Sequence, residues 1–340
     1  MIKTEISLLT NNHITPFQNL YKEQRIKCVE FNKLFATRSL AEHGLGFLIN
    51  IYGIDNNNDL YEKKILSKII FDTGSSNLTF IHNLNIRGYQ IYDINSIILS
   101  HWHYDHTGGL YRILQGIEDK IPVICHESAQ FERFFRRTDD IKFRDLIGKT
   151  RREILPMLSA SKIINQEPID VKKIKNLGGK VIFSKNNYEL FNFDGLKIII
   201  SGEIPRNYDI EDFNSFYLLH DNIIKNDKIL DDKCLIFEYE NNIVLLTGCC
   251  HSGIMNTLNY IKSITDKPIS HIIGGFHMAY ASNQRIKETI KYLKSFQKYE
   301  NPLYLFPLHC SGEKFLFELI KANNPNLKAF NMSVGTVFNF

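Results

Sequence analysis

Residues 97–110 read IILSHWHYDHTGGL, and this stretch combines a β-branched apolar run with four metal-binding side chains. The run predicts a strand, after which His101, His103, Asp105 and His106 precede a Thr-Gly-Gly turn. Alternate side chains of an extended segment point the same way, so His101 and His103 can face one metal ion. The following turn can bring Asp105 and His106 toward a second ion. Imidazole and carboxylate groups bind zinc and similar divalent metals, so the sequence predicts a metal site at the end of this strand.

A surface patch rich in histidine, or a set of ordinary core histidines, is the simpler interpretation of this segment. A single histidine would fit it, but four ligand side chains within six positions at a strand end favour metal binding. Three ligands that leave one coordination position open form a catalytic site and not a closed structural one. We therefore predict a catalytic centre with one or two divalent ions, with zinc as the expected metal and manganese or iron as alternatives.

Further ligand side chains follow other apolar runs. LLTGCCHSG at 245–253, GGFHM at 274–278 and LFPLHCSG at 305–312 each place a histidine after such a run and close to glycine. A backbone turn at glycine can present these side chains at a shared sheet edge. Together the segments supply Cys249, Cys250, His251, His277, His309 and Cys310. For His277, an ordinary structural role is a strong alternative. Among functional roles, support of a ligand or contact with substrate is as well supported as direct ligation.

The chain alternates between short apolar runs and helical patterns. The runs have the length of strands and are bounded by Gly, Asn or Asp; they lie at 68–72, 96–100, 122–126, 196–201, 234–239, 242–247 and 271–276. Apolar residues at helical spacing predict helices over 253–264, 283–299 and 313–320. The segment 234–247 predicts a hairpin with a polar turn. This mixture predicts an α/β (α+β) fold and a single domain over residues 1–340.

Residues 128–180 differ from the rest because they are rich in charged and aromatic residues and poor in strand patterns. We predict a mostly helical insertion or lid over one face, and the alternative is a surface helical excursion without a role in binding. Within it, residues 133–152 form a basic cluster, which either grips an acidic substrate or forms a solvated helix face.

The bulk properties exclude several classes of protein. With 41 Lys and Arg against 37 Asp and Glu, the net charge of +4 lacks the basic footprint of a general nucleic-acid binder. The longest apolar runs have only strand length, so no membrane span is expected. The N-terminus lacks a secretory signal pattern, and six cysteines in 340 residues form no dense disulfide framework. A cytoplasmic protein with free thiols is expected.

The segment 101–106 matches the HxHxDH signature of the metallo-β-lactamase-fold superfamily, and FDTG at 71–74 matches the turn that precedes this signature. The resemblance implies a four-layered αββα sandwich with the metal site at an edge where strand ends meet. A closer similarity covers nearly the whole chain, to the branch with archaeal dihydropterin-6-ylmethyl-(ribofuranosyl)aminobenzene 5′-phosphate synthases and uncharacterised metal-dependent hydrolases. Its motifs occur in order: HGLGFLI at 43–49, FDTGSS at 71–76, SHWHYDHTGGL at 100–110, SGEIPR at 201–206, DDKCLIF at 231–237, TGCCHSGIMNT at 247–257, GGFHM at 274–278 and PLHCSGE at 307–313.

The resemblance also implies how the ligands divide. One ion would be held by His101, His103 and His251, and a second by Asp105, His106 and His309. Glu203 stands where the superfamily's usual third histidine motif falls, and Cys249 stands where its bridging aspartate falls. Without that aspartate, the second ion would be weakly bound or absent. Cys249 is either a thiolate ligand or a buried small apolar side chain, and the latter is slightly preferred.

Three other side chains, and a catalytic role for Asp105, complete the candidate site. Asp72 either accepts a hydrogen bond from a metal-bound imidazole or is a turn residue before Gly74. Arg206 either binds an anionic substrate group bidentately or is an ordinary surface arginine. Glu203 is a further candidate for substrate binding or ligand support. Asp105 is the catalytic candidate, expected to ligate a metal, orient its water or take a proton.

The superfamily resemblance implies an enzyme that acts through a metal-bound hydroxide. The first hypothesis is a hydrolase of an ester, lactone or phosphoester. The second is a transferase that joins a dihydropterin to an aminobenzene ribofuranoside phosphate. The third, from a different class, is a non-catalytic metal-binding or sensory protein. The expected partner is a small, anionic substrate, with no membrane and no nucleic acid, and the oligomeric state is left open.

Overall fold

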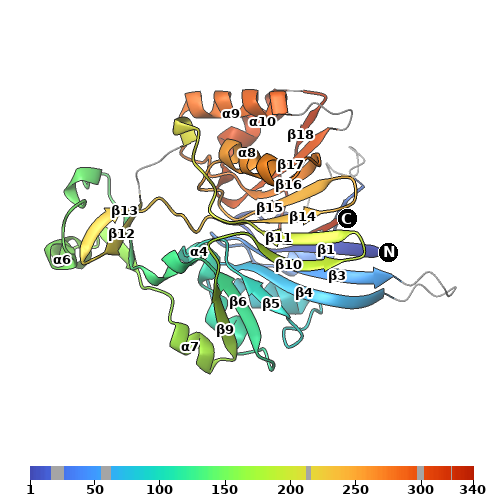
Figure 1. The fold of residues 1–340 in the computed structure, drawn as a ribbon, viewed down its shortest axis with the longest axis horizontal. Helices are drawn as coiled ribbons and strands as arrows, with labels where there is room; N and C mark the ends of the chain where they lie inside the picture. The colour runs from blue at the N-terminus through green and yellow to red at the C-terminus, as the bar shows by residue number, and fades with distance from the viewer. Residues whose placement is uncertain (17–26, 55–62, 212–215, 297–301, 323) are drawn as a thin grey trace.

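The computed structural model describes residues 1–16, 27–54, 63–211, 216–296, 302–322 and 324–340. Two large mixed sheets dominate it (Figure 1). The first has the strand order β2 (Val29–Phe31), β19 (Thr336–Asn339), β1 (Ile2–Thr10), β3 (Gly46–Ile54), β4 (Lys63–Thr73), β5 (Ser96–Ile98), β6 (Ile121–Cys125) and β9 (Gly179–Phe183). The second has the order β10 (Tyr188–Phe193), β11 (Leu196–Ile200), β14 (Cys234–Glu238), β15 (Ile243–Thr247), β16 (Ile269–Gly275), β17 (Leu303–Leu308) and β18 (Leu327–Ala329).

Helices cover the outer faces of both sheets. In Figure 1, helices α8 (Ile254–Ile264), α9 (Asn283–Phe296) and α10 (Glu313–Lys321) lie over the second sheet. The first sheet is flanked by α3 (Thr79–Ile86), α5 (Leu110–Leu114) and α7 (Val171–Asn176), with the short α4 (Tyr104–Thr107) after β5. The other short helices are α2 (Lys33–Arg38), η1 (Glu127–Gln130), η2 (Phe143–Asp145), η3 (Asp209–Glu211) and η4 (His309–Ser311).

Three apolar cores separate these layers. Strand β15 shows why: Val244 and Leu246 pack between the two sheets, whereas Ile243 and Leu245 pack against the helices of the second sheet. Successive side chains of a strand point to opposite faces, so a strand buried on both faces reads as a continuous apolar run. A third core lies between the first sheet and its helices. The predicted four-layered αββα fold is confirmed.

The parallel strand pairs decide where the ligands meet. Strands β4, β5 and β6 run parallel in the first sheet, and β15, β16 and β17 run parallel in the second. Carboxyl ends of parallel strands lie at the same sheet edge, so the residues that follow β4, β5, β15, β16 and β17 are brought together there. The predicted strands all occur, the hairpin is the antiparallel β14–β15 pair, and the three predicted helices are α8, α9 and α10. Residues 297–299 of the second predicted helix lie outside the described residues.

The region 128–180 is not mostly helical, contrary to the expectation from its sequence. It contributes β9 to the first sheet, as well as α6 (Arg151–Ser159), α7, and two strands of a small third sheet. This small sheet has the order β13 (Ile223–Asn226), β12 (Phe216–His220), β7 (Arg133–Arg136) and β8 (Ile163–Gln166), and it encloses its own apolar cluster. β7 pairs with β8 on one side and with β12, about eighty positions later in the chain, on the other, so local patterns could not reveal the sheet.

Among the helices of the described residues, none is long and apolar enough to cross a membrane.

Lys233 is a buried basic residue at the entry to β14. Its side chain is 1% exposed, and its Nζ donates a hydrogen bond to the carbonyl of Ser201 at 2.8 Å. Burial lowers the pKa of Lys233 to about 8, although Asp231 opposes the shift. The unfolded chain keeps the ordinary pKa of 10.5. Between these two values the unfolded state therefore binds a proton that the native state has lost.

We predict a measurable consequence for stability. As pH rises from about 8 to about 10.5, the free energy of unfolding of the wild type should increase relative to that of Lys233→Met by up to about 3 kcal/mol. Below the folded pKa both states are protonated, so the difference should level off. Urea unfolding of both proteins across this pH range measures it. A difference that stays constant across the window would contradict the buried, neutral state of Lys233.

Candidate metal centre

The histidines that follow β5 turn their ring nitrogens toward one another and toward His251, which follows β15. His101 Nε2 lies 3.0 Å from His103 Nδ1 and 3.1 Å from His251 Nε2. All three rings are buried, with at most 4% of each residue exposed. Burial lowers the pKa of each ring, which leaves neutral imidazoles with lone pairs for a cation. The structure therefore brings the three imidazoles together, but the compact ligand group among the described residues joins His101 and His251 with Cys249, and His103 is not part of it.

A second group of potential ligands adjoins the first. Single ligand atoms of Asp105, His106, Cys249 and His309 all lie within 4.8 Å of one another. His309 Nε2 is 3.1 Å from Asp105 Oδ2, and His106 Nε2 is 3.9 Å from the same oxygen. Burial would raise the pKa of Asp105, but the nearby His106 and His309 hold it below its usual value. The carboxylate is therefore charged and suited to a divalent cation.

Cys249 connects the two groups. Its thiol lies 3.0 Å from His106 Nε2, and the same sulfur forms a second potential ligand set with His101 and His251. The preceding Gly248 makes this approach possible, because a Cβ there would lie 2.4 Å from the Cβ of Ser100. Cys249 thus occupies the place expected for a bridging ligand, in polar contact with His106. Burial raises the pKa of this thiol, so a bound cation would be needed to hold it as thiolate.

Asp72, which lies within β4 near its carboxyl end, orients two of the histidines. Its Oδ2 accepts a hydrogen bond from His106 Nδ1 at 2.6 Å and from the Ser100 hydroxyl at 2.7 Å, while Oδ1 accepts from the Ser100 amide at 2.7 Å. Because the Ser100 hydrogen goes to Asp72, its oxygen can accept from His101 Nδ1 at 2.9 Å. Burial would lower the pKa of His106, but Asp72 and Asp105 raise it to about 9. These contacts favour the orienting role, and the positive φ of Asp72 (58°) shows that it is a turn residue as well.

His309 is oriented by the end of β1. Its Nδ1 donates to Asn12 Oδ1 at 2.7 Å, and its backbone amide donates to Asn11 Oδ1 at 3.0 Å. Asn12 also contacts His43, whose Nε2 lies 3.4 Å from Asp105 Oδ2. Neither asparagine was a candidate from sequence, although both lie within two positions of the end of β1. Thus His101, His106 and His309 each anchor Nδ1 on the protein and point Nε2 into the centre, as ligating histidines do.

The buried Arg133 of β7 holds the backbone between two predicted ligands. Its Nη1 donates to the carbonyl of Trp102 at 2.9 Å, and its Nη2 donates to Asp231 Oδ1 at 2.7 Å. Asp231 Oδ2 in turn accepts the amide hydrogen of Trp102 at 2.7 Å, and Asp227 forms a further ion pair with Arg133 at 2.9 Å. For Arg133, the interpretation as part of a solvated helix face is therefore wrong: the residue is 0% exposed and lies in a strand.

The small sheet also packs on His103. The ring of Phe216 is stacked 4.9 Å from the imidazole, and Phe135, its cross-strand neighbour, meets the imidazole edge-on at 5.2 Å. Trp102 Nε1 donates to the carbonyl of Glu167, just after β8, at 2.9 Å. These contacts show that the region expected to be an insertion or lid borders the candidate site. Whether it moves as a lid stays a prediction.

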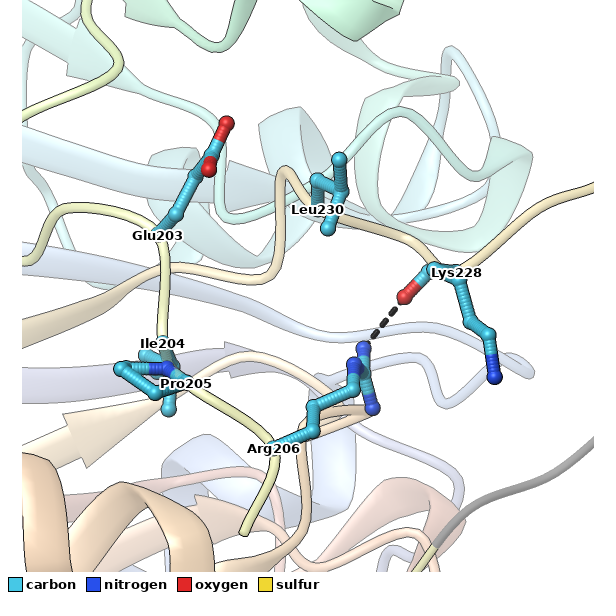
Figure 2. Close-up of a pocket in the computed structure, with 6 residues that line it drawn as sticks. All are labelled: Glu203, Ile204, Pro205, Arg206, Lys228 and Leu230. Atoms are coloured by element: carbon cyan, nitrogen blue, oxygen red, sulfur yellow. Dashed lines mark hydrogen bonds between the residues drawn. The ribbon is translucent and has the colours of Figure 1, made fainter.

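Glu203 and Arg206 lie on a neighbouring surface. They line a cavity of about 380 Å³ together with Ile204, Pro205, Lys228 and Leu230 (Figure 2). Arg206 donates to the carbonyls of His251 at 2.8 Å and of Lys228, so its guanidinium supports the backbone of a predicted ligand. Glu203 accepts from His126 Nε2 at 3.1 Å. Neither side chain belongs to a ligand group found in the described part of the chain, and their substrate-binding roles stay predictions.

Left-handed backbone conformations gather at this edge. Four non-glycine residues there have positive φ: Asp72 (58°), Cys250 (59°), His277 (47°) and His309 (49°). Such conformations cost energy and persist where surrounding structure fixes them, which is common at functional sites. One of these turns, at Cys250, lies between Cys249 and His251, which both reach the centre.

Comparisons with known proteins agree with this fold and sequence pattern. The sequence model of the metallo-β-lactamase superfamily matches residues 67–181. Two Methanocaldococcus jannaschii proteins are each 29% identical to this chain. The similarity to the uncharacterized protein MJ0448 covers 84% of this chain and 90% of the relative. The similarity to 7,8-dihydropterin-6-methyl-4-(β-D-ribofuranosyl)-aminobenzene-5′-phosphate synthase covers 81% of this chain and 82% of the relative. Among solved structures, Tm1679, a metal-dependent hydrolase of the β-lactamase superfamily, aligns with a TM-score of 0.65 at 17% identity, over 99% of this chain and 98% of that one.

Proposed function

We propose that the chain, whose residues 67–181 match the sequence model of the metallo-β-lactamase superfamily, is a metal-dependent hydrolase of a small anionic ester, lactone or phosphoester. One observation carries this proposal. His101, His106 and His309, from two distant strand ends, each anchor Nδ1 on Ser100, Asp72 or Asn12 and direct Nε2 inward. That arrangement leaves donor atoms converging on a shared centre, which fits a divalent cation.

The proposed ligands are those predicted from sequence, with Cys249 added between them. His101, His103 and His251 would hold one ion, and Asp105, His106 and His309 a second. The Cys249 thiolate would lie between them, because its sulfur groups both with His101 and His251 and with Asp105, His106 and His309. When bound, a divalent ion supplies Lewis acidity toward water and toward a substrate oxygen. The imidazoles and the thiolate make zinc a suitable ion.

Asp105 and His43 are the residues proposed to handle a proton. Asp105 is 8% exposed and charged, and its Oδ2 faces both His309 and His43. The side chain of His43 is 57% exposed, and burial together with His309 lowers the pKa of its ring. A proton accepted by Asp105 can therefore pass to a neutral imidazole that is in contact with solvent.

A transferase is the second candidate, because one of the 29% identical relatives is named as a dihydropterin-linked synthase. The similarity covers 82% of that relative's length. The corresponding reaction would join a dihydropterin, activated as its diphosphate, to an aminobenzene ribofuranoside phosphate. The same centre would then stabilise charge on phosphate oxygens of the leaving group.

One set of assays separates these functions. Metal-loaded protein is incubated with dihydropterin diphosphate and aminobenzene ribofuranoside phosphate, with a phosphodiester, and with a lactone. Turnover of the phosphodiester or the lactone, lost on chelation and regained with zinc, supports the hydrolase. Formation of the condensed pterin product supports the transferase. Metal-loaded protein that turns over none of these substrates would contradict both and favour the non-catalytic alternative.

A further inference from the structure

A third group of ligand atoms lies where β15, β16 and β17 end. The sulfur of Cys249, a ring nitrogen of His277 and the sulfur of Cys310 all lie within 4.8 Å of one another. The three residues come from adjacent parallel strands of one sheet. Cys249 is buried, and the other two are partly buried. Unlike the two sets described above, this one contains two sulfurs and no carboxylate.

The backbone around this group is fixed by hydrogen bonds between neighbouring strand ends. The amides of Met278 and Ala279 both donate to the carbonyl of Cys310 at 3.1 Å. The amide of Phe276 donates to the hydroxyl of Ser311, also at 3.1 Å. These bonds fasten the turn that carries His277 to the turn that carries Cys310. The position of the imidazole relative to the thiol is therefore set before any ligand arrives.

Two glycines leave the room that this packing needs. A Cβ on Gly275 would lie 2.7 Å from the sulfur of Cys310 and 3.0 Å from the Cα of Cys249. A Cβ on Gly312 would lie 2.5 Å from the Cα of Ala279, and φ there is +78°. Side chains at either position would push the two turns apart. The sequence thus provides glycine at the positions where Cys249 and Cys310 approach each other.

We infer that Cys249, His277 and Cys310 form a further metal-binding position for a soft divalent ion such as zinc or cadmium. The inference rests on the proposed function to the extent that Cys249 is shared with the imidazole–carboxylate centre. Binding displaces one proton from each of the two thiols to solvent, and the thiolates bind the cation. Two thiolates and an imidazole form a softer ligand set than Asp105, His106 and His309, so the two positions differ in metal preference.

Cobalt titration of the reduced, metal-free protein tests this inference. Cobalt bound by thiolate gives a near-ultraviolet charge-transfer absorption, which imidazole and carboxylate ligands do not give. Cys310→Ser and Cys310→Ala should each weaken that band to roughly half and lower bound metal by about one ion per chain. His277→Gln should weaken cobalt binding about 10- to 100-fold and leave the band visible at saturation.

Cys250→Ser is the matched control. Cys250 adjoins Cys249 and is equally buried, but its sulfur contacts the Thr257 hydroxyl at 3.4 Å and packs toward the helices. This variant should keep both the band and the metal content. Cys310 variants that also keep both would overturn the inference, and Cys310 would then serve only as a hydrogen-bond donor to the carbonyl of Cys249, 3.4 Å away.

The same titration distinguishes failure of this inference from failure of the proposed function. If His101→Ala retains all metal while Cys310→Ser loses an ion, the imidazole centre is wrong and the thiolate position stands. If His101→Ala loses metal while Cys310→Ser retains it, the thiolate position is wrong and the imidazole centre stands.

Discussion

Replacing His101 with alanine is expected to release bound metal and to lower turnover by about three orders of magnitude. The ring of His101 faces both His103 and His251, so its loss removes the nitrogen common to the first ligand set. A metal ion contributes several kcal/mol of transition-state stabilisation, and each 1.4 kcal/mol corresponds to about a factor of ten in rate. Metal content by mass spectrometry after purification without added metal, and turnover of the best substrate from the assays, measure the two effects.

His271→Asn serves as the control for loss of a partly buried imidazole outside the proposed centre. His271 lies on β16, stacked 5.0 Å from the ring of Tyr304, and burial lowers its pKa to about 4. It belongs to none of the ligand groups among the described residues, so this variant should retain metal. His309→Ala should lose the second ion and keep the first. If both His101→Ala and His309→Ala keep the wild-type metal content, the proposed centre is wrong.

Replacing Arg133 with methionine is expected to lower the free energy of unfolding by about 3–5 kcal/mol, the cost of breaking a buried ion pair by removing one partner. Arg133 is 0% exposed, and it neutralises Asp227 and Asp231, which are 2% and 1% exposed. Burial would raise the pKa of Asp231, but Arg133 lowers it to about 2. Urea unfolding of the metal-free protein measures the effect without a contribution from metal binding.

Two further variants test whether the loss of stability comes from the buried ion pairs of Arg133. Arg136→Met removes an exposed arginine from the same strand and should change stability by no more than about 0.5 kcal/mol. Arg133→Met combined with Asp227→Asn and Asp231→Asn should be more stable than Arg133→Met alone, because no buried charge is left without a partner. An Arg133→Met variant as stable as Arg136→Met would show that the cluster contributes nothing to folding.

The Arg133 cluster also links the small sheet to metal binding. Trp102 lies between His101 and His103, and both of its backbone polar groups are bound by this cluster. Residues that orient ligands typically contribute about 10- to 100-fold to metal affinity. Folded Arg133→Met protein should therefore bind zinc more weakly than Arg136→Met protein by a comparable factor. The small sheet would then act in function through the geometry of the ligand segment, whether or not it covers the substrate.

The ligands that lie close together in the chain were predictable from sequence, because neighbouring residues fix their secondary structure and spacing. His101, His103, Asp105 and His106 follow one strand, and strand periodicity together with ligand chemistry identifies them. Seven strands of the two large sheets and the three helices over the second sheet were predictable for the same reason, since apolar spacing reports which faces are buried. Asp72 was identified from its short motif, but its hydrogen bond to His106 connects residues 34 positions apart.

Tertiary structure alone decided which distant residues share the centre. Cys249 was slightly favoured as a plain buried side chain, yet pairing of β15 with β16 and the closeness of Gly248 to Ser100 place its sulfur beside His106. The partners of Arg133 lie 94 and 98 positions further along the chain, at Asp227 and Asp231, and no local pattern marks them. Local sequence patterns identify the ligand types and the strand ends that carry them. Which of these ligands lie beside one another depends on the order of the strands and on the turns with positive φ. Both are established only when the whole chain has packed.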